Sequence, residues 1–101
     1  MWAWGLNTQN QLGDGTNVWR DVPTQIGSAT NWASVSAGYD HTVALKSDGS
    51  LWAWGYNTQG VLGFGHDGPI LIPTQIGTAT DWTFVAAGHS FTHAIKSDGT
   101  L

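Results

Sequence analysis

Hydrophobic positions along the chain occur in short runs of β-branched and aromatic residues, separated by glycine-rich turns. This pattern predicts strands at 35–38, 42–46 and 51–55, and a last strand near 72–76. Residues 47–50 read Ser-Asp-Gly-Ser, which predicts a tight hairpin turn in which glycine supplies the positive φ. Because side chains alternate along a strand, two tryptophans two residues apart in 51–55 should share one face.

Helices are not predicted. Glycine recurs every few residues, Pro23 and Pro73 interrupt the pattern, and apolar residues do not follow the spacing of three and four that marks a helix face. The expected fold class is therefore all-β.

An internal repeat of 50 residues organises the chain. Residues 2–51 align with 52–101 without a gap, and 28 of the 50 residue pairs are identical. Periods of about 40 to 50 residues are typical of propellers and helical arrays. Four predicted strands per repeat favour the propeller, with four-stranded antiparallel blades and two blades in the single segment 1–101.

The repeat also resembles a known family. The stretch from Trp54 to Gly65 has the pattern Trp-Gly-Xaa-Asn followed by Leu-Gly-Xaa-Gly, and Pro73, Ile76, 85–88 (Val-Ala-Ala-Gly) and 96–99 (Lys-Ser-Asp-Gly) follow it. This pattern is similar to the repeat of the regulator of chromosome condensation family. The resemblance implies a β-propeller, commonly seven-bladed, that serves as a protein-binding scaffold, and fold alone does not assign a function.

The same family includes a plant ultraviolet receptor with a Gly-Trp-Arg-His-Thr motif. Here the motif reads Gly-Tyr-Asp-His-Thr at 38–42 and Gly-His-Ser-Phe-Thr at 88–92, so light sensing is not expected. The resemblance implies a structural role within the blade for His41, whose counterpart in the second repeat is Phe91.

Composition narrows the range of functions. The chain of 101 residues has three Lys and Arg against seven acidic residues, a net charge of −4, so it lacks the basic surface that binds nucleic acid or an anionic membrane. It has no cysteine, which excludes disulfides and thiolate chemistry. No apolar run is long enough to span a membrane, and its first residues do not resemble a signal peptide.

No catalytic, cofactor-binding or metal-binding residue is predicted. His89 and His93 would stand about 13 Å apart along a strand, too far to share an ion. Asp14, Thr16 and Asn17 lack the spacing of a calcium loop, and His66 with Asp67 is the remaining minor metal candidate. The glycine-rich segments match no phosphate-binding motif, and no nucleophile motif occurs, so we do not expect an enzyme.

Six of the seven tryptophans occupy equivalent positions in the two repeats. Repeated position argues for packing between blades rather than for a ligand platform. We assign this assembly and packing role to Trp2, Trp4, Trp32, Trp52, Trp54 and Trp82.

The two repeats diverge most at 14–22 and 64–72, where only Gly15 and Gly65 are identical. A segment released from shared packing is often a surface loop on a binding face. The residues that we expect to contact a protein partner are Trp19, Arg20, His66, Ile70 and Leu71. Drift in a loop without a partner is the competing interpretation.

Two blades cannot close a propeller. Residues 1–27 hold the last two strands of one blade, and 78–101 hold the first two of another, so we expect half-blades at both termini. Head-to-tail completion by further copies would form a ring or a filament. Eight blades from four chains are favoured over six blades from three, because long repeats with bulky tryptophans suit a wider ring.

Two function hypotheses follow. The first is a non-enzymatic, self-assembling propeller module or scaffold, either engineered or excised from a longer chain. The alternative is a protein-binding module that uses the variable loops 14–22 and 64–72.

Overall fold

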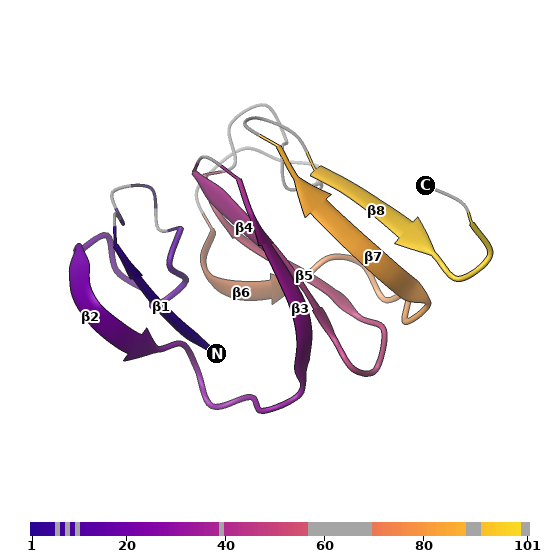
Figure 1. The fold of residues 1–101 in the computed structure, drawn as a ribbon, viewed down its shortest axis with the longest axis horizontal. Coiled ribbons are helices and arrows are strands. Elements are labelled where there is room, and N and C mark those ends of the chain that lie inside the picture. Colours follow the sequence, from indigo (N-terminus) through magenta and orange to yellow (C-terminus); the bar gives the residue numbers. More distant parts are fainter. Residues whose placement is uncertain are drawn as a thin grey trace.

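The computed structural model describes residues 1–5, 7, 9, 11–38, 40–56, 70–88 and 92–99. Within these residues the chain forms antiparallel strands joined by turns and loops (Figure 1). In chain order the strands are β1 (Trp2–Gly5), β2 (Arg20–Gln25), β3 (Trp32–Ala37), β4 (His41–Lys46), β5 (Leu51–Gly55), β6 (Ile70–Gln75), β7 (Trp82–Ala87) and β8 (Thr92–Lys96).

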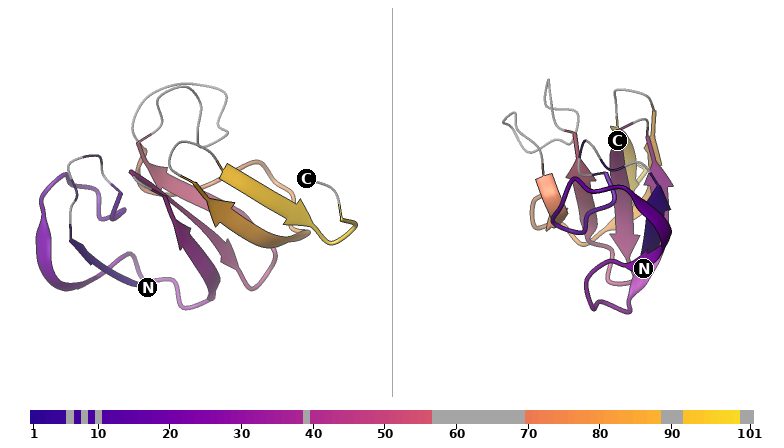
Figure 2. Two further views of the ribbon diagram at one scale, coloured as in Figure 1. Left: turned by 45° about the horizontal axis from the view of Figure 1, so that its top comes forward. Right: turned by 90° about the vertical axis from the view of Figure 1, so that its left-hand side faces the viewer.

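Three sheets follow one another along the molecule. A four-stranded sheet with the order β3-β4-β5-β6 lies between the pair β1-β2 and the pair β7-β8 (Figures 1 and 2). We call the four-stranded sheet the central blade. This architecture confirms the all-β class and the four-stranded antiparallel blade.

Some predicted strand bounds were wrong. The first strand of the central blade begins at Trp32 rather than at residue 35, because Trp32 pairs with Lys46 beyond a β-bulge. The last strand begins at Ile70, which pairs with Gly55, rather than near residue 72. At a β-bulge, strand pairing continues although the alternation of inward and outward side chains is interrupted. The alternation of residues in the sequence therefore does not show where such a strand begins.

The two flanking pairs reproduce opposite halves of the central blade. Trp2 pairs with Gln25 as Trp52 pairs with Gln75, so β1-β2 has the register of β5-β6. In β7-β8, Trp82 pairs with Lys96 in the register of Trp32 and Lys46 in β3-β4. We call β1-β2 the outer half-blade and β7-β8 the inner half-blade.

The hairpin between β4 and β5 has the predicted glycine turn. Gly49 has a φ of 84° and donates its N–H to the Lys46 carbonyl at 3.0 Å, while Lys46 donates back to the Ser50 carbonyl at 3.1 Å. Asp48 accepts hydrogen bonds from the Ser50 backbone and hydroxyl. Gly99 repeats this conformation after β8, with a φ of 86°.

The main core lies between the central blade and the inner half-blade. Val43, Leu45, Leu51 and Ala53 of the central blade cluster with Val85 of β7, and all five are buried. The Ala87 N–H also donates to the Ser36 hydroxyl at 3.0 Å. Burying these apolar surfaces fixes β7-β8 against β3 and β4.

Proline occupies the outermost strands. Pro23 lies in β2 and Pro73 in β6, each at the free edge of its sheet among the described strands. Proline has no N–H to donate, so it is tolerated at such edges and not in the middle of a sheet.

Candidate interaction surface

An aromatic seam joins the start of β3 to β5. The Trp32 ring lies edge-on to Trp52 and to Trp54, with centroids 5.9 Å apart in each pair. Trp54 is 1% exposed, and its indole N–H donates to the Gln11 carbonyl at 3.0 Å. This bond ties the loop after β1 to the central blade, so Trp54 holds two neighbouring sheets together.

A lysine lies over tryptophan in both the central blade and the inner half-blade. The ammonium of Lys46 lies 4.0 Å from the Trp52 ring centroid and 5.0 Å from that of Trp32. In the inner half-blade, the Lys96 ammonium lies 5.1 Å from the Trp82 centroid and 3.9 Å from an Asp81 oxygen. Trp32, Trp52 and Trp82 are all half-buried.

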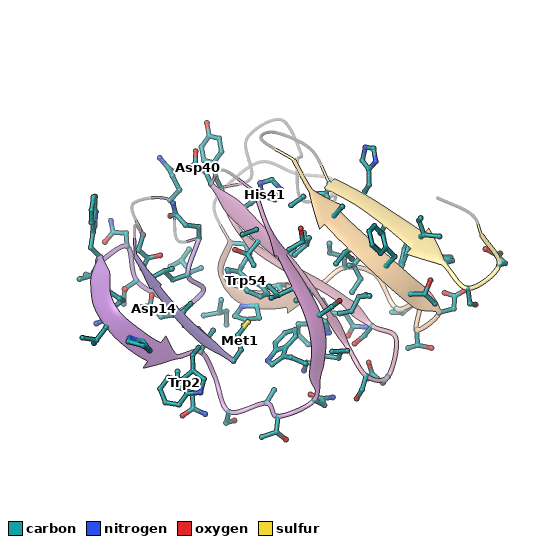
Figure 3. All side chains as sticks on the ribbon, viewed as in Figure 1. Met1, Trp2, Asp14, Asp40, His41 and Trp54 are labelled. Carbon is teal, nitrogen blue, oxygen red and sulfur yellow. The ribbon has the colours of Figure 1, made fainter. Side chains whose placement is uncertain are left out.

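Trp2 has the repeat position of Trp52 but a different environment. It lies on β1 and is 61% exposed (Figure 3). Met1 has the place before Trp2 that Leu51 has before Trp52, and its carbonyl accepts the Ile26 N–H as that of Leu51 accepts the Ile76 N–H. The Trp4 side chain is outside the described part of the structure.

A hollow of about 270 Å³ opens beside β1. Met1, Trp2 and Ala3 line one side, and residues of β3, β4 and β5, including Val35 and Trp54, line the other. In the central blade the inner strand β4 occupies the corresponding edge of β5. Among the described strands β1 pairs only with β2, so its other edge carries no strand partner there.

The loop before β2 is built on a buried acidic residue. Asp14, whose side chain is 7% exposed, accepts hydrogen bonds from Thr16, from Asn7 Nδ2 at 3.1 Å and from Arg20 Nε at 2.8 Å. Burial alone would raise the pKa of this carboxyl, but the bonds from Thr16 and Arg20 outweigh it and lower the pKa to about 2.

Asn7 completes this loop. It is fully buried, donates to the Thr16 and Val18 carbonyls at 2.9 Å and 3.0 Å, and accepts the Leu12 N–H. Sequence reasoning did not assign it a role, although its identity with Asn57 was a usable signal. Asn7 and Asp14 fix the path of the chain into β2.

The residues expected to contact a partner have different environments. Trp19 is 64% exposed and Leu71 is 43% exposed. Arg20 is bound to Asp14, and Ile70 is half-buried against the core cluster. His66 lies outside the described residues, so of this set the structure shows only Trp19 and Leu71 as exposed apolar side chains.

Metal ligands do not gather in the described ranges: no three His, Asp or Glu side chains there lie together. The oxygens of Asp14 are engaged by the hydrogen-bond donors named above. A search of the same residues found no helix with the length and apolarity needed to cross a membrane.

Sequence comparison identifies the repeat. The chain matches the regulator of chromosome condensation (RCC1) repeat over residues 1–45 and 48–95, and a second description of this repeat matches residues 32–61. The chain belongs to the RCC1 repeat family.

Solved structures with the RCC1-type fold superpose on the chain. The crystal structure of human WBSCR16 is 20% identical, with a TM-score of 0.86 over 96% of this chain. Prp20p from Saccharomyces cerevisiae is 22% identical, with a TM-score of 0.78 over 92%. Yeast RCC1 (Prp20) in its structure with Kap60 is 21% identical, with a TM-score of 0.77 over 96%. The chain spans 26% of each of these three chains, and the likeness shows the propeller fold.

His41 shows how the two RCC1 repeats of the chain join. It is 2% exposed, and its Nε2 lies 3.3 Å from the Thr92 hydroxyl of β8. The resemblance implied a role within the blade, and the structure adds this contact between neighbouring sheets.

Proposed function

We propose that the 101-residue chain, with repeats 2–51 and 52–101, is a self-assembling propeller module without catalytic activity. The observation that carries the proposal is the match between the two half-blades and the central blade. The outer half-blade has the register of β5-β6, and the inner half-blade has the register of β3-β4. One complete blade results when β8 of one copy pairs with β1 of the next.

The central blade predicts the register of that junction. Within it, Thr42 pairs with Trp54, Val43 with Ala53 and Ala44 with Trp52. Shifting each position by the repeat length pairs Thr92 with Trp4, His93 with Ala3 and Ala94 with Trp2 of the next copy. Such a heterologous contact closes into a ring when its rotation permits.

The number of copies follows from two blades per chain. A tetramer gives eight blades and a trimer gives six, and we favour the tetramer because long repeats with bulky tryptophans between blades suit a wider ring. In a longer polypeptide, flanking repeats would supply the same strands, whereas the 101-residue chain by itself needs further copies to supply them.

A cysteine pair tests the junction, since the chain contains no cysteine of its own. Ala3→Cys with His93→Cys places two thiols on opposed strands of neighbouring copies, within the reach of a disulfide. Oxidation should give covalent species that end at the tetramer on a non-reducing gel, and a series ending at the trimer would support six blades.

The matched control is Val43→Cys with Ala53→Cys, the same strand pair inside one chain. It should oxidise without producing covalent oligomers. A double variant at Ala3 and His93 that stays monomeric after oxidation, together with a native mass of 10.8 kDa at every concentration, would refute the proposal.

A second candidate function rests on exposed apolar residues near β2. Val18, Trp19 and Val22 are 55%, 64% and 62% exposed, within the segment where the repeats diverge. Large apolar side chains grouped on a surface are typical of protein-binding sites. The solved relatives include one described by its binding to Gsp1p and histones and one bound to Kap60.

We propose that this surface binds a protein, with Trp19 and Leu71 as exposed contacts and Arg20 and Ile70 as further contacts. His66, which lies outside the described residues, completes the proposed set by its sequence position. Purified Gsp1p, core histones and Kap60 are the first probes, in a direct binding assay. Trp19→Ser should weaken binding at least tenfold, as expected for a buried tryptophan anchor. Binding unaffected by Trp19→Ser, or no binding to any probe, would count against this function.

A further inference from the structure

The lysine and tryptophan pair of the inner half-blade is an incomplete copy of the one in the central blade. Lys46 lies over two rings, Trp52 at 4.0 Å and Trp32 at 5.0 Å. Lys96 lies over Trp82 at 5.1 Å, the counterpart of Trp32. Among the described residues, no ring takes the place that Trp52 has beside Lys46.

Trp2 is the residue that matches the missing ring. It has the repeat position of Trp52, and its pairing with Gln25 repeats that of Trp52 with Gln75. Trp2 is 61% exposed, whereas Trp52 is half-buried. The same side chain is therefore covered in one repeat and uncovered in the other.

We propose that Trp82 and Lys96 form a receiving site for Trp2 of a second copy of this chain. The inference rests on the proposed self-assembly and identifies the side chains that select the partner strand. Trp2 inserts against Lys96 and lies edge-on to Trp82, as Trp52 does against Lys46 and Trp32.

The receiving site has an acidic residue beside its lysine. An Asp81 oxygen lies 3.9 Å from the Lys96 ammonium, which lies over the Trp82 ring, and the lysine side chain is 33% exposed. The first repeat has the neutral Asn31 at the position of Asp81. The carboxylate of Asp81 therefore accompanies the lysine in the half-blade where the second ring is absent, and the central blade has no charge at that position.

The geometry also selects the edge that binds. Gln25 and its neighbours cover the other edge of β1, so Trp2 can meet an inner half-blade only along the free edge. A cation held against two rings is attracted to both ring faces, more strongly once water is removed. A β1 strand without a tryptophan at residue 2 would pair through its backbone but lose this attraction.

A double-mutant cycle tests the site. Sedimentation velocity over a dilution series gives the dissociation constant of the assembly for the wild type, Lys96→Met, Trp2→Ala and the double variant. Each single change should raise the dissociation constant. The coupling factor between Lys96 and Trp2, which measures their direct interaction, should be about 2- to 30-fold. The double variant should therefore be weakened by less than the product of the single effects.

Two controls separate binding from folding. Lys96→Arg keeps the cation and should leave the constant within about twofold of the wild type. Lys46→Met makes the matched change inside one chain, and it should lower thermal stability while leaving the coupling between Trp2 and Lys96 unchanged.

The same measurements distinguish a failure of the receiving site from a failure of self-assembly. A wild-type chain that remains monomeric throughout the series overturns both. A wild-type chain that assembles, with effects of Lys96→Met and Trp2→Ala that simply multiply, overturns the receiving site and leaves self-assembly standing.

Discussion

The indole of Trp54 lies against the backbone of Gly13, so close that a Cβ at residue 13 would stand 2.7 Å from the ring. Gly13 belongs to the loop between β1 and β2, whereas Trp54 belongs to β5. The loop carbonyl of Gln11 accepts hydrogen bonds from the Trp54 indole and from the Thr42 hydroxyl at 2.9 Å. The absence of a side chain at residue 13 lets the outer half-blade dock on the central blade.

Gly13→Ala should destabilise the chain by about 2 to 4 kcal/mol. The added methyl meets the Trp54 ring, and the residue keeps a φ of 77° that side chains disfavour. Urea unfolding monitored by circular dichroism measures the change. Gly27→Ala is the matched control, because its φ is 62° and no atom lies within 4 Å of the added Cβ. Equal losses in the two variants would show that the contact with Trp54 is unimportant.

Trp54→Ala should cost about 3 to 5 kcal/mol, the usual loss for truncating a buried tryptophan. Trp2→Ala removes the same side chain from an exposed site and should cost less than about 1 kcal/mol in the dissociated chain. Thermal unfolding at high dilution measures both losses. A similar loss for Trp2→Ala would mean that Trp2 packs within its own chain.

Gly49 and Gly99 offer a second matched pair, since their φ values are 84° and 86°. A Cβ at Gly49 would collide with the Thr80 carbonyl, whereas one at Gly99 meets no atom within 4 Å. In the dissociated chain Gly49→Ala should cost about 2 to 4 kcal/mol and Gly99→Ala about 1 to 2 kcal/mol. In the proposed ring, Thr30 of the next copy would take the place of Thr80, so Gly99→Ala should also weaken assembly. Sedimentation velocity would contradict this if Gly99→Ala assembled like the wild type.

The Asp14 carboxyl should make stability depend on pH. Its pKa falls from 3.8 to about 2 on folding, so the folded state holds the ionised form more strongly than the unfolded chain does. This contribution, roughly 2 kcal/mol, is complete above the unfolded pKa and is lost as the pH falls from about 5 to 2. Hydrogen bonds from Ser50 lower the pKa of the exposed Asp48 as well, so it acts in the same direction.

Asp14→Asn measures that contribution. The variant should be less stable at pH 7 because the amide nitrogen cannot accept the bond that Arg20 donates. Its free energy of unfolding should change less than that of the wild type between pH 5 and pH 2. Parallel profiles for the two proteins would exclude Asp14 as the titrating group.

The sequence predicted the strands and turn of the blade because turn conformation and side-chain alternation depend on residues close together in the chain. Gly49 marks its turn by conformation alone, and Trp52 and Trp54 share a face through strand alternation. The start of β3 at Trp32 was missed, since a bulge is a property of two paired strands.

The environments of the candidate site residues were harder to predict. Asp14 stands opposite Phe64 in the alignment of the repeats, so comparing the repeats marked its segment as variable and gave no sign of its hydrogen bonds. Ile70 and Trp19 were grouped by the same variability. The pleat of β6 turns Ile70 toward the core, while Trp19 precedes β2 and stays exposed.

The prolines of β2 and β6 limit how copies of this chain can associate. Unpaired strand edges are templates for amyloid-like stacking, and the two outermost edges, at Pro23 and Pro73, each lack a backbone donor. Among the described strands, β1, β3, β7 and β8 form the other sheet edges, and β1 and β8 carry different halves of a blade. In the proposed ring, growth would therefore be polar: subunits would add around an axis through these two edges and not through the proline-bearing edges.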